Sequence, residues 1–145
     1  MRFPRFISTV LIIGSFITAC SHVGGSRGTL EDAALRQKLV GAWIGSRAMS
    51  TNQVLSWKTL VHSDGTFSVQ NNTRDITGHL LHSVRMEGTF VVANGAVVVT
   101  FTKSSENDKA LPRTIRPEPI VRVDDHELVI ITETGAESVS RKVLQ

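Results

Sequence analysis

Apolar and polar residues alternate along most of the chain after Gly41, a pattern that is typical of half-buried β-strands. Asp64-Gly65 and Asn94-Gly95 stand between alternating segments, and such pairs are strong signals for tight hairpin turns. Asp124-Asp125 supplies another turn. After a first strand that begins near Gly41, the pattern predicts strands over residues 55–61, 67–69, 80–86, 88–93, 96–103, 120–123, 128–132 and 137–143.

One short helix is expected before these strands. Thr29 has the position of an N-cap, and acidic residues follow it in what would be the first turn. Apolar residues then recur at near-helical spacing as far as Leu39. The spacing predicts a helix over about Leu30–Leu39 that ends near Gly41.

The predicted elements indicate an all-β fold. No helical period separates the strands, so parallel pairing through crossover helices is not expected. Eight or nine short antiparallel strands either close into a barrel or stack as a sandwich. Residues 104–113 are polar and typical of a loop, and Pro117 and Pro119 indicate a strand that starts late or lies at an edge. The short sequential hairpins favour an antiparallel up-and-down barrel of about eight strands, preceded by the helix.

The N-terminus has the three parts of a secretory signal peptide. Arg2 and Arg5 precede an apolar run over residues 7–17, which is shorter than the roughly 20 residues that span a bilayer. The run ends in Ile17-Thr18-Ala19-Cys20. An ordinary cleavage site has small residues in an A-x-A arrangement, which Ile17 does not fit.

These four residues resemble the lipobox of bacterial lipoproteins. The resemblance implies cleavage after Ala19, a diacylglyceryl group on the Cys20 sulfur and lasting attachment to a membrane through two or three acyl chains. Ser21 is not the Asp that resembles an inner-membrane retention signal, so the outer membrane is the expected location rather than the inner one. The predicted organisation is a signal peptide over 1–19, a lipidated flexible tether over 20–28 and a barrel domain over 29–145.

Composition limits the expected partners. The chain has 16 basic and 13 acidic residues, and Arg2 and Arg5 fall within the signal peptide, which leaves 14 basic residues against 13 acidic ones. Without a run of basic residues, no nucleic-acid partner is expected. Cys20 is the one cysteine, so the predicted domain folds without a disulfide.

No residue pattern predicts catalysis or a cofactor. His62-Ser63-Asp64 contains the residue types of a triad, but neighbours along a strand point to opposite faces. His79 and His82 face opposite ways for the same reason, and a metal would need ligands from other strands. Asp124, Asp125 and Glu127 lack the ligand spacing of a calcium loop. No glycine-rich phosphate loop is present. We therefore expect neither an enzyme nor a metal protein.

Several short motifs occur in an order that resembles small bacterial lipocalin-like domains: Leu39-Val40-Gly41-Ala42-Trp43, His62-Ser63-Asp64-Gly65-Thr66-Phe67, Glu87-Gly88-Thr89-Phe90, Asp124-Asp125-His126-Glu127-Leu128 and a late Arg141. The resemblance covers about residues 35–143. It implies that Trp43 closes one barrel end, that Arg141 packs across its ring, and that a small apolar molecule binds inside. The chain is shorter than most lipocalins and lacks their usual disulfide.

Three functions remain open from the sequence. The domain could bind a small apolar ligand, bind an envelope protein as a hydrolase inhibitor would, or serve as a structural accessory. Trp57, Phe67, Phe90 and Phe101 either line a cavity or form an ordinary core, and eight strands leave an interior that side chains can fill. A cavity would favour the first function, whereas a filled barrel with an exposed apolar or charged patch would favour the second.

Overall fold

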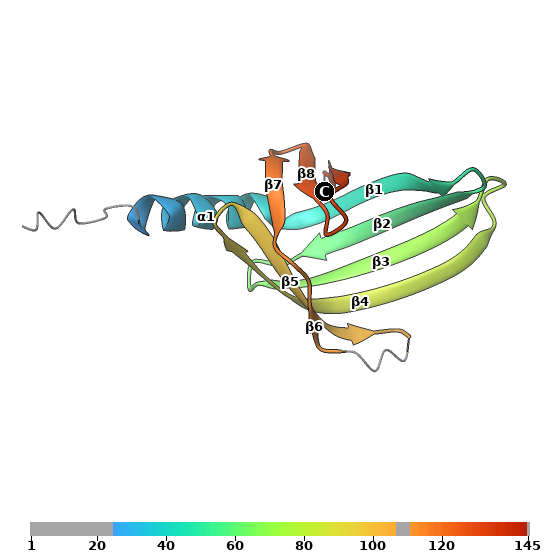
Figure 1. Ribbon diagram of the computed structural model, residues 1–145, viewed down its shortest axis with the longest axis horizontal. Coiled ribbons are helices and arrows are strands. Elements are labelled where there is room, and N and C mark those ends of the chain that lie inside the picture. The colour runs from blue at the N-terminus through green and yellow to red at the C-terminus, as the bar shows by residue number, and fades with distance from the viewer. Residues whose placement is uncertain (1–24, 107–110, 145) are drawn as a thin grey trace, which may run out of the picture.

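The computed structural model describes residues 25–106 and 111–144. This part of the chain contains one helix, nine strands and the turns between them (Figure 1). The elements are α1 (Gly25–Leu39), β1 (Gly41–Ser50), β2 (Gln53–Val61), β3 (Thr66–Asp75), β4 (Leu80–Ala93), β5 (Ala96–Ser104), β6 (Arg113–Thr114), β7 (Glu118–Val123), β8 (Glu127–Ile131) and β9 (Glu137–Val143). The predicted signal peptide and Cys20 lie outside the described residues.

Eight of the strands form a closed antiparallel barrel, which confirms the predicted fold class. Neighbours in the chain pair with one another from β1 to β5, then β5 pairs with β7, β7 with β8, and β8 with β9. Pairing of β9 with β1, with Trp43 opposite Lys142, closes the ring. The short β6 pairs with β5 beside β7. Within the closed part of the ring, each of the eight strands has a hydrogen-bonded neighbour on both sides.

The barrel is lopsided because β1 to β4 are much longer than β7 to β9. Pairing of β1 with β9 ends at Ile44, and pairing of β4 with β5 ends at Met86, whereas β1 to β4 continue together to their hairpin tips. We call this four-stranded continuation, residues 46–56 and 70–84, the extension. Figure 1 shows it projecting away from α1.

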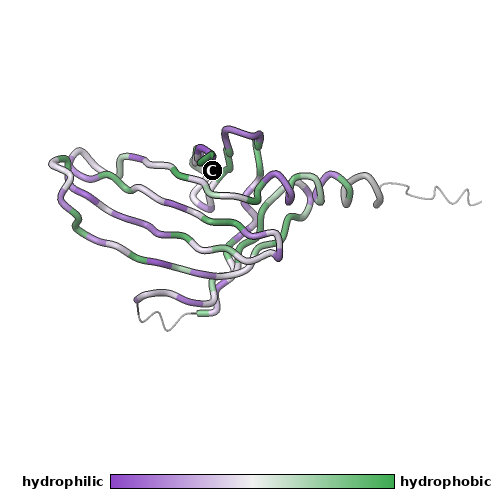
Figure 2. Tube along the Cα trace, turned by 180° about the vertical axis from the view of Figure 1, so that it is seen from behind, coloured by the Kyte–Doolittle hydropathy of each residue, from purple (hydrophilic) through white to green (hydrophobic). Residues whose placement is uncertain are grey.

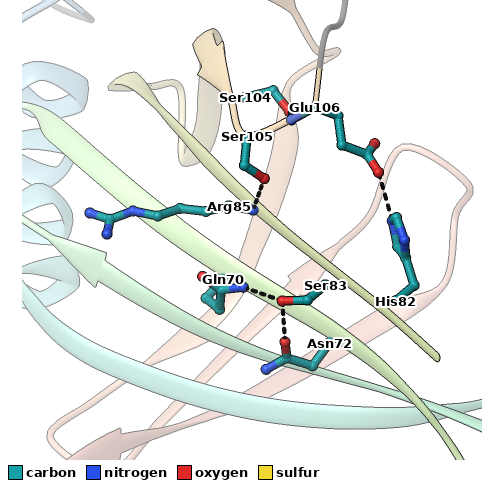
Figure 3. A network of polar contacts seen from close by, with 8 residues as sticks. All are labelled: Gln70, Asn72, His82, Ser83, Arg85, Ser104, Ser105 and Glu106. Carbon is teal, nitrogen blue, oxygen red and sulfur yellow. Dashed lines mark hydrogen bonds and ion pairs between the residues drawn. The ribbon is translucent and has the colours of Figure 1, made fainter. Parts of the chain in front are cut away.

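The outer face of the extension carries a network of polar side chains (Figure 3). Gln70 Nε2 donates to Ser83 Oγ at 2.6 Å, and Ser83 Oγ donates to Asn72 Oδ1 at 2.8 Å. At its edge, His82 Nε2 lies 3.1 Å from Glu106 Oε1. This polar surface fits a sheet that faces water, so the core lies elsewhere.

The core occupies the end of the barrel next to α1. Its buried side chains are Leu39, Trp43, Phe67, Phe90, Val97 and Val123. Figure 2 shows the corresponding hydrophobic segments gathered where the helix meets the strands. The alternating residues of the second and third strands, Trp57, Thr59, Val61, Phe67 and Val69, all face the interior, as the sequence predicts.

Helix α1 is longer than the sequence predicts. It begins at Gly25 instead of Leu30, so Thr29 lies inside the helix and the predicted N-cap is wrong. Glycine has low helix propensity, which is why the sequence predicts a flexible tether as far as Gly28. Once a helix is nucleated, however, each further residue extends it at small cost in free energy. The helix extends into the segment expected to be the tether.

Polar contacts fasten α1 across the barrel end. Asp32 accepts hydrogen bonds from the backbone N–H groups of Asn94 and Gly95, in the turn between β4 and β5, at 2.8 and 2.9 Å. Arg36 Nη2 donates to the Ser63 carbonyl in the turn between β2 and β3 at 3.2 Å. Because two different hairpins hold the helix, it closes this end of the barrel.

Candidate functional site: an apolar cavity in the barrel

The barrel encloses a cavity of about 280 Å³ whose wall is mainly apolar. The aromatic residues that line it are Trp43, Trp57, Phe67, Phe90 and Phe101. Phe67 and Phe101 meet edge to face, with ring centroids 5.5 Å apart. These rings stand on β1 to β5, and aliphatic side chains fill the spaces between them. The sequence left open whether the four aromatic residues other than Trp43 form core or line a cavity; in the structure all four line the cavity, and Phe67 and Phe90 also belong to the buried core.

Trp43 forms the floor of the cavity at the helix end. Its side chain is only 1% exposed, and its Nε1 donates to the Leu39 carbonyl at 2.7 Å. Leu39 is the last residue of α1, so this bond also satisfies a carbonyl that a helix end leaves without a partner. The expected closure of one barrel end by Trp43 is what the structure has.

The cation over Trp43 is Lys142, and the prediction of Arg141 was wrong. Lys142 Nζ lies 5.1 Å from the ring centroid and donates to the Lys38 carbonyl. Lys142 is the register partner of Trp43, whereas Arg141 pairs with Ile44 and is exposed. Successive residues of a strand point to opposite faces, so Arg141 lies on the outer wall.

Trp57 closes the seam where β1 and β9 separate. Its ring lies across Gly45, where a Cβ atom would stand 2.3 Å from Trp57 Cζ2 and 2.6 Å from the Val139 carbonyl oxygen. Trp57 Nε1 donates to Ser140 Oγ on β9 at 2.9 Å. Because residue 45 is glycine, the Trp57 ring can pack against β1 and form part of the barrel wall where β1 and β9 no longer pair.

Apart from Thr59 on β2, the polar part of the lining belongs to β7, to β9 and to the residue after β8. Glu118 begins β7, Thr132 follows β8 directly, and Ser138 lies at the start of β9. These three side chains are partly exposed, in contrast to the buried floor of Leu39, Trp43 and Phe90. The cavity therefore runs from an apolar floor at α1 to a polar mouth at the opposite ends of the short strands.

Glu118 is held at this mouth in an environment that disfavours its charge. Partial burial, together with the neighbouring negative charge of Glu133, raises the pKa of the Glu118 carboxyl. A hydrogen bond from the Glu133 backbone N–H to Glu118 Oε1, at 3.2 Å, opposes the shift. The net result is a carboxyl that keeps its proton to a higher pH than an exposed glutamate.

Glu118→Gln is expected to stabilise the fold at neutral pH and to leave stability almost unchanged at low pH. Since the folded pKa is raised, the protonated form is favoured in the fold, and this contribution is lost as pH rises through the folded pKa. Glutamine keeps the shape without the charge. Thermal unfolding of both proteins from pH 3 to pH 8 checks this. A melting-temperature difference that shrank with rising pH would contradict it.

The other residues considered for chemistry serve turns or the surface. Asp64 Oδ1 accepts from the backbone N–H and the hydroxyl of Thr66, and the hydroxyl contact is the main cause that lowers the Asp64 pKa. Asp124 Oδ1 accepts from the N–H groups of His126 and Glu127, so it belongs to a hairpin turn. In the described part of the chain, no cluster of His, Cys, Asp and Glu side chains could hold a metal ion.

The sequence did not identify the polar mouth. Glu118 stands between two prolines, where no alternation marks an inner face. Ser138 and Ser140 are small polar residues on a strand that was predicted from its valines. The sequence signal that could have identified these serines is the two-residue period over 137–143, which places Ser138, Ser140 and Lys142 on one face of the strand.

Comparison with known proteins finds no family model that matches the chain and no curated protein with significant sequence similarity. Within the described residues, no helix has the length and apolar character needed to cross a membrane.

Proposed function

We propose that this chain is a lipid-anchored lipoprotein of the bacterial outer membrane whose barrel binds a small apolar molecule in its interior. The observation that carries the proposal is the cavity of about 280 Å³ with an aromatic and aliphatic wall. Ligand sites are typically concave, mostly apolar and equipped with a few polar groups, and begin at about 300 Å³. The lipocalin resemblance of the sequence supports the same proposal.

The energetics favour a ligand with a compact apolar body. Each square ångström of apolar surface removed from water contributes about 25 cal/mol, and the lining rings would bury both their own surface and that of the ligand. Because the cavity is at the small end of the usual range, we expect a single short chain or ring system rather than a large lipid.

Val99→Phe is expected to weaken ligand binding at least tenfold. Val99 lines the cavity, so a larger side chain there takes up the volume that the ligand needs. Val91→Phe is the matched control, because Val91 is 58% exposed on the outer face of β4. The full-length chain in dodecylmaltoside micelles is titrated with ω-bromo-octanol. Its bromine quenches tryptophan fluorescence, and both tryptophans of the chain line the cavity.

Saturable quenching of the wild type and of Val91→Phe, with loss in Val99→Phe, is the expected result. Circular dichroism spectra of the three proteins establish that each is folded. A folded wild-type protein that gives no saturable quenching would refute the proposed ligand site and leave the protein-binding alternative.

Cys20→Ala is expected to prevent lipidation and to leave the chain as an uncleaved precursor. The reason is the sequence Ile17-Thr18-Ala19-Cys20, in which the thiol is the only group that the proposed lipid attachment can use. Ser21→Ala is the control, since it leaves the cysteine in place. Metabolic labelling with palmitate followed by electrophoresis measures both variants. Equal labelling of Cys20→Ala and wild type would contradict the anchor.

Binding of an envelope protein is the second candidate, and the tip of the extension favours it. Large apolar side chains are exposed there: Met49, Val54, Ile76, Leu80 and Leu81. In Figure 2, hydrophobic colour returns at this end of the molecule. Arg74 stands opposite Val54 on one side and Leu80 on the other. A partner for this surface would present apolar side chains beside acidic groups.

A further inference from the structure

The ionic character of the cavity is set by one residue. Among the described residues that line it, Glu118 is the one with an ionisable side chain, and the rest are aromatic, aliphatic or hydroxyl-bearing. No lysine, arginine or histidine is part of this lining. The charge acting on Glu118 is that of another carboxylate, Glu133. A ligand head group at the mouth would therefore meet a negative environment.

Two side chains at the mouth also have unused hydrogen-bond acceptors. Glu118 Oε1 accepts from the Glu133 N–H, and no hydrogen bond to Oε2 is formed within residues 25–106 and 111–144. Ser138 Oγ also has no hydrogen-bond partner within these residues, whereas the Thr132 hydroxyl already contacts Thr134 and Ala136. A carboxylate oxygen on β7 and a hydroxyl oxygen on β9 thus remain available, with β8 between the two strands.

These features discriminate between apolar ligands by their head groups. The carboxylate of a fatty acid would bring a second negative charge to Glu118, and the lining offers it no cation. A plain hydrocarbon would remove more water from Glu118 without replacing its hydrogen bonds. An ammonium group has three donors and no acceptor, so it would form charge-assisted hydrogen bonds with the carboxylate.

We propose that the cavity is selective for a cationic amphiphile, a primary alkyl or arylalkyl amine whose ammonium group binds Glu118 at the mouth while its apolar body lies against Trp43, Phe67 and Phe90. This inference rests on the proposed ligand-binding function and names the class of ligand. Partial burial and the Glu133 charge raise the pKa of Glu118, and a bound ammonium group would oppose both effects by favouring the carboxylate.

The test compares three ligands that differ only in the head group. The full-length chain in dodecylmaltoside micelles is titrated at pH 7 with ω-bromo-octylamine, ω-bromo-octanol and ω-bromo-octanoate, and quenching of Trp43 and Trp57 reports occupancy of the cavity. At this pH an alkyl amine is protonated and an alkyl carboxylate is ionised. We expect the amine to bind at least tenfold more tightly than the carboxylate, with the alcohol between them.

Glu118→Gln is expected to remove the preference, with at least a tenfold loss for the amine and a gain for the carboxylate. Glu137→Gln is the matched control, because Glu137 begins β9 and is exposed outside the cavity lining. Binding of all three ligands with equal affinity, or an unchanged order in Glu118→Gln, would overturn the head-group proposal while the ligand-binding function stands. Absence of quenching by every ligand would refute the ligand-binding function itself. The comparison on wild-type protein decides the matter even if a variant fails to fold.

Discussion

Replacing Trp43 by alanine is expected to lower the free energy of unfolding by about 3 to 5 kcal/mol, as for other large buried aromatic residues. The ring is almost fully buried and forms the cavity floor. Its loss would enlarge the cavity, leave the Leu39 carbonyl without its donor and expose one side of the joint between α1 and β1. Chemical denaturation followed by far-ultraviolet circular dichroism measures the change.

Two neighbouring substitutions separate the contribution of the Trp43 ring to stability from that of the charged side chains near it. Lys142→Ala should cost about 0.5 to 1 kcal/mol, the range of a partly exposed cation–π contact. Arg141→Ala should change stability by less than about 0.5 kcal/mol, since its side chain is exposed on the outer wall. A larger loss for Arg141→Ala than for Lys142→Ala would contradict the register of β9 against β1.

The fold could be predicted because apolar and polar residues alternate along short segments, which distinguishes the inner face of a strand from its outer face. Asn94-Gly95 and Asp64-Gly65 mark hairpins with the residues that such turns require, and Asn94 does adopt a positive φ of 54°. The lengths of the strands were harder to predict. Polar residues such as Asn71 and Asn72 continue β3 to Asp75, because pairing with β2 and β4 supports a strand that its own composition would not.

The site could be predicted only in part, because contact depends on register rather than residue type. Trp43 was identified as a barrel-end residue, but whether Arg141 or Lys142 faces it depends on which one pairs with it across β1 and β9. A shift of one residue exchanges the two faces of a strand. Glu118 was missed for a related reason: its inward position follows from pairing with Val97 on β5, a contact between distant parts of the chain.

Gly88→Ala is the second substitution for which we expect a large effect, a loss of about 3 kcal/mol, at the upper end of the range for overpacked cores. Gly88 lies at the irregularity where β4 changes register against β5. A Cβ atom there would stand 2.1 Å from the Thr100 carbonyl oxygen and 2.9 Å from Phe67 Cε1. The first contact is with backbone, so it is relieved only if β4 and β5 move apart.

The same substitution connects the fold to the cavity. Phe67 lines the cavity, and pressure from a methyl group at position 88 would push its ring toward the space that the proposed ligand occupies. We therefore expect the folded Gly88→Ala protein to bind ω-bromo-octanol more weakly as well as to unfold at lower denaturant concentration. Thr89→Ala is the control, because Thr89 is the exposed neighbour on the same strand and its loss should cost less than about 0.5 kcal/mol. Wild-type stability in Gly88→Ala would contradict the close approach of the Thr100 carbonyl oxygen to Gly88.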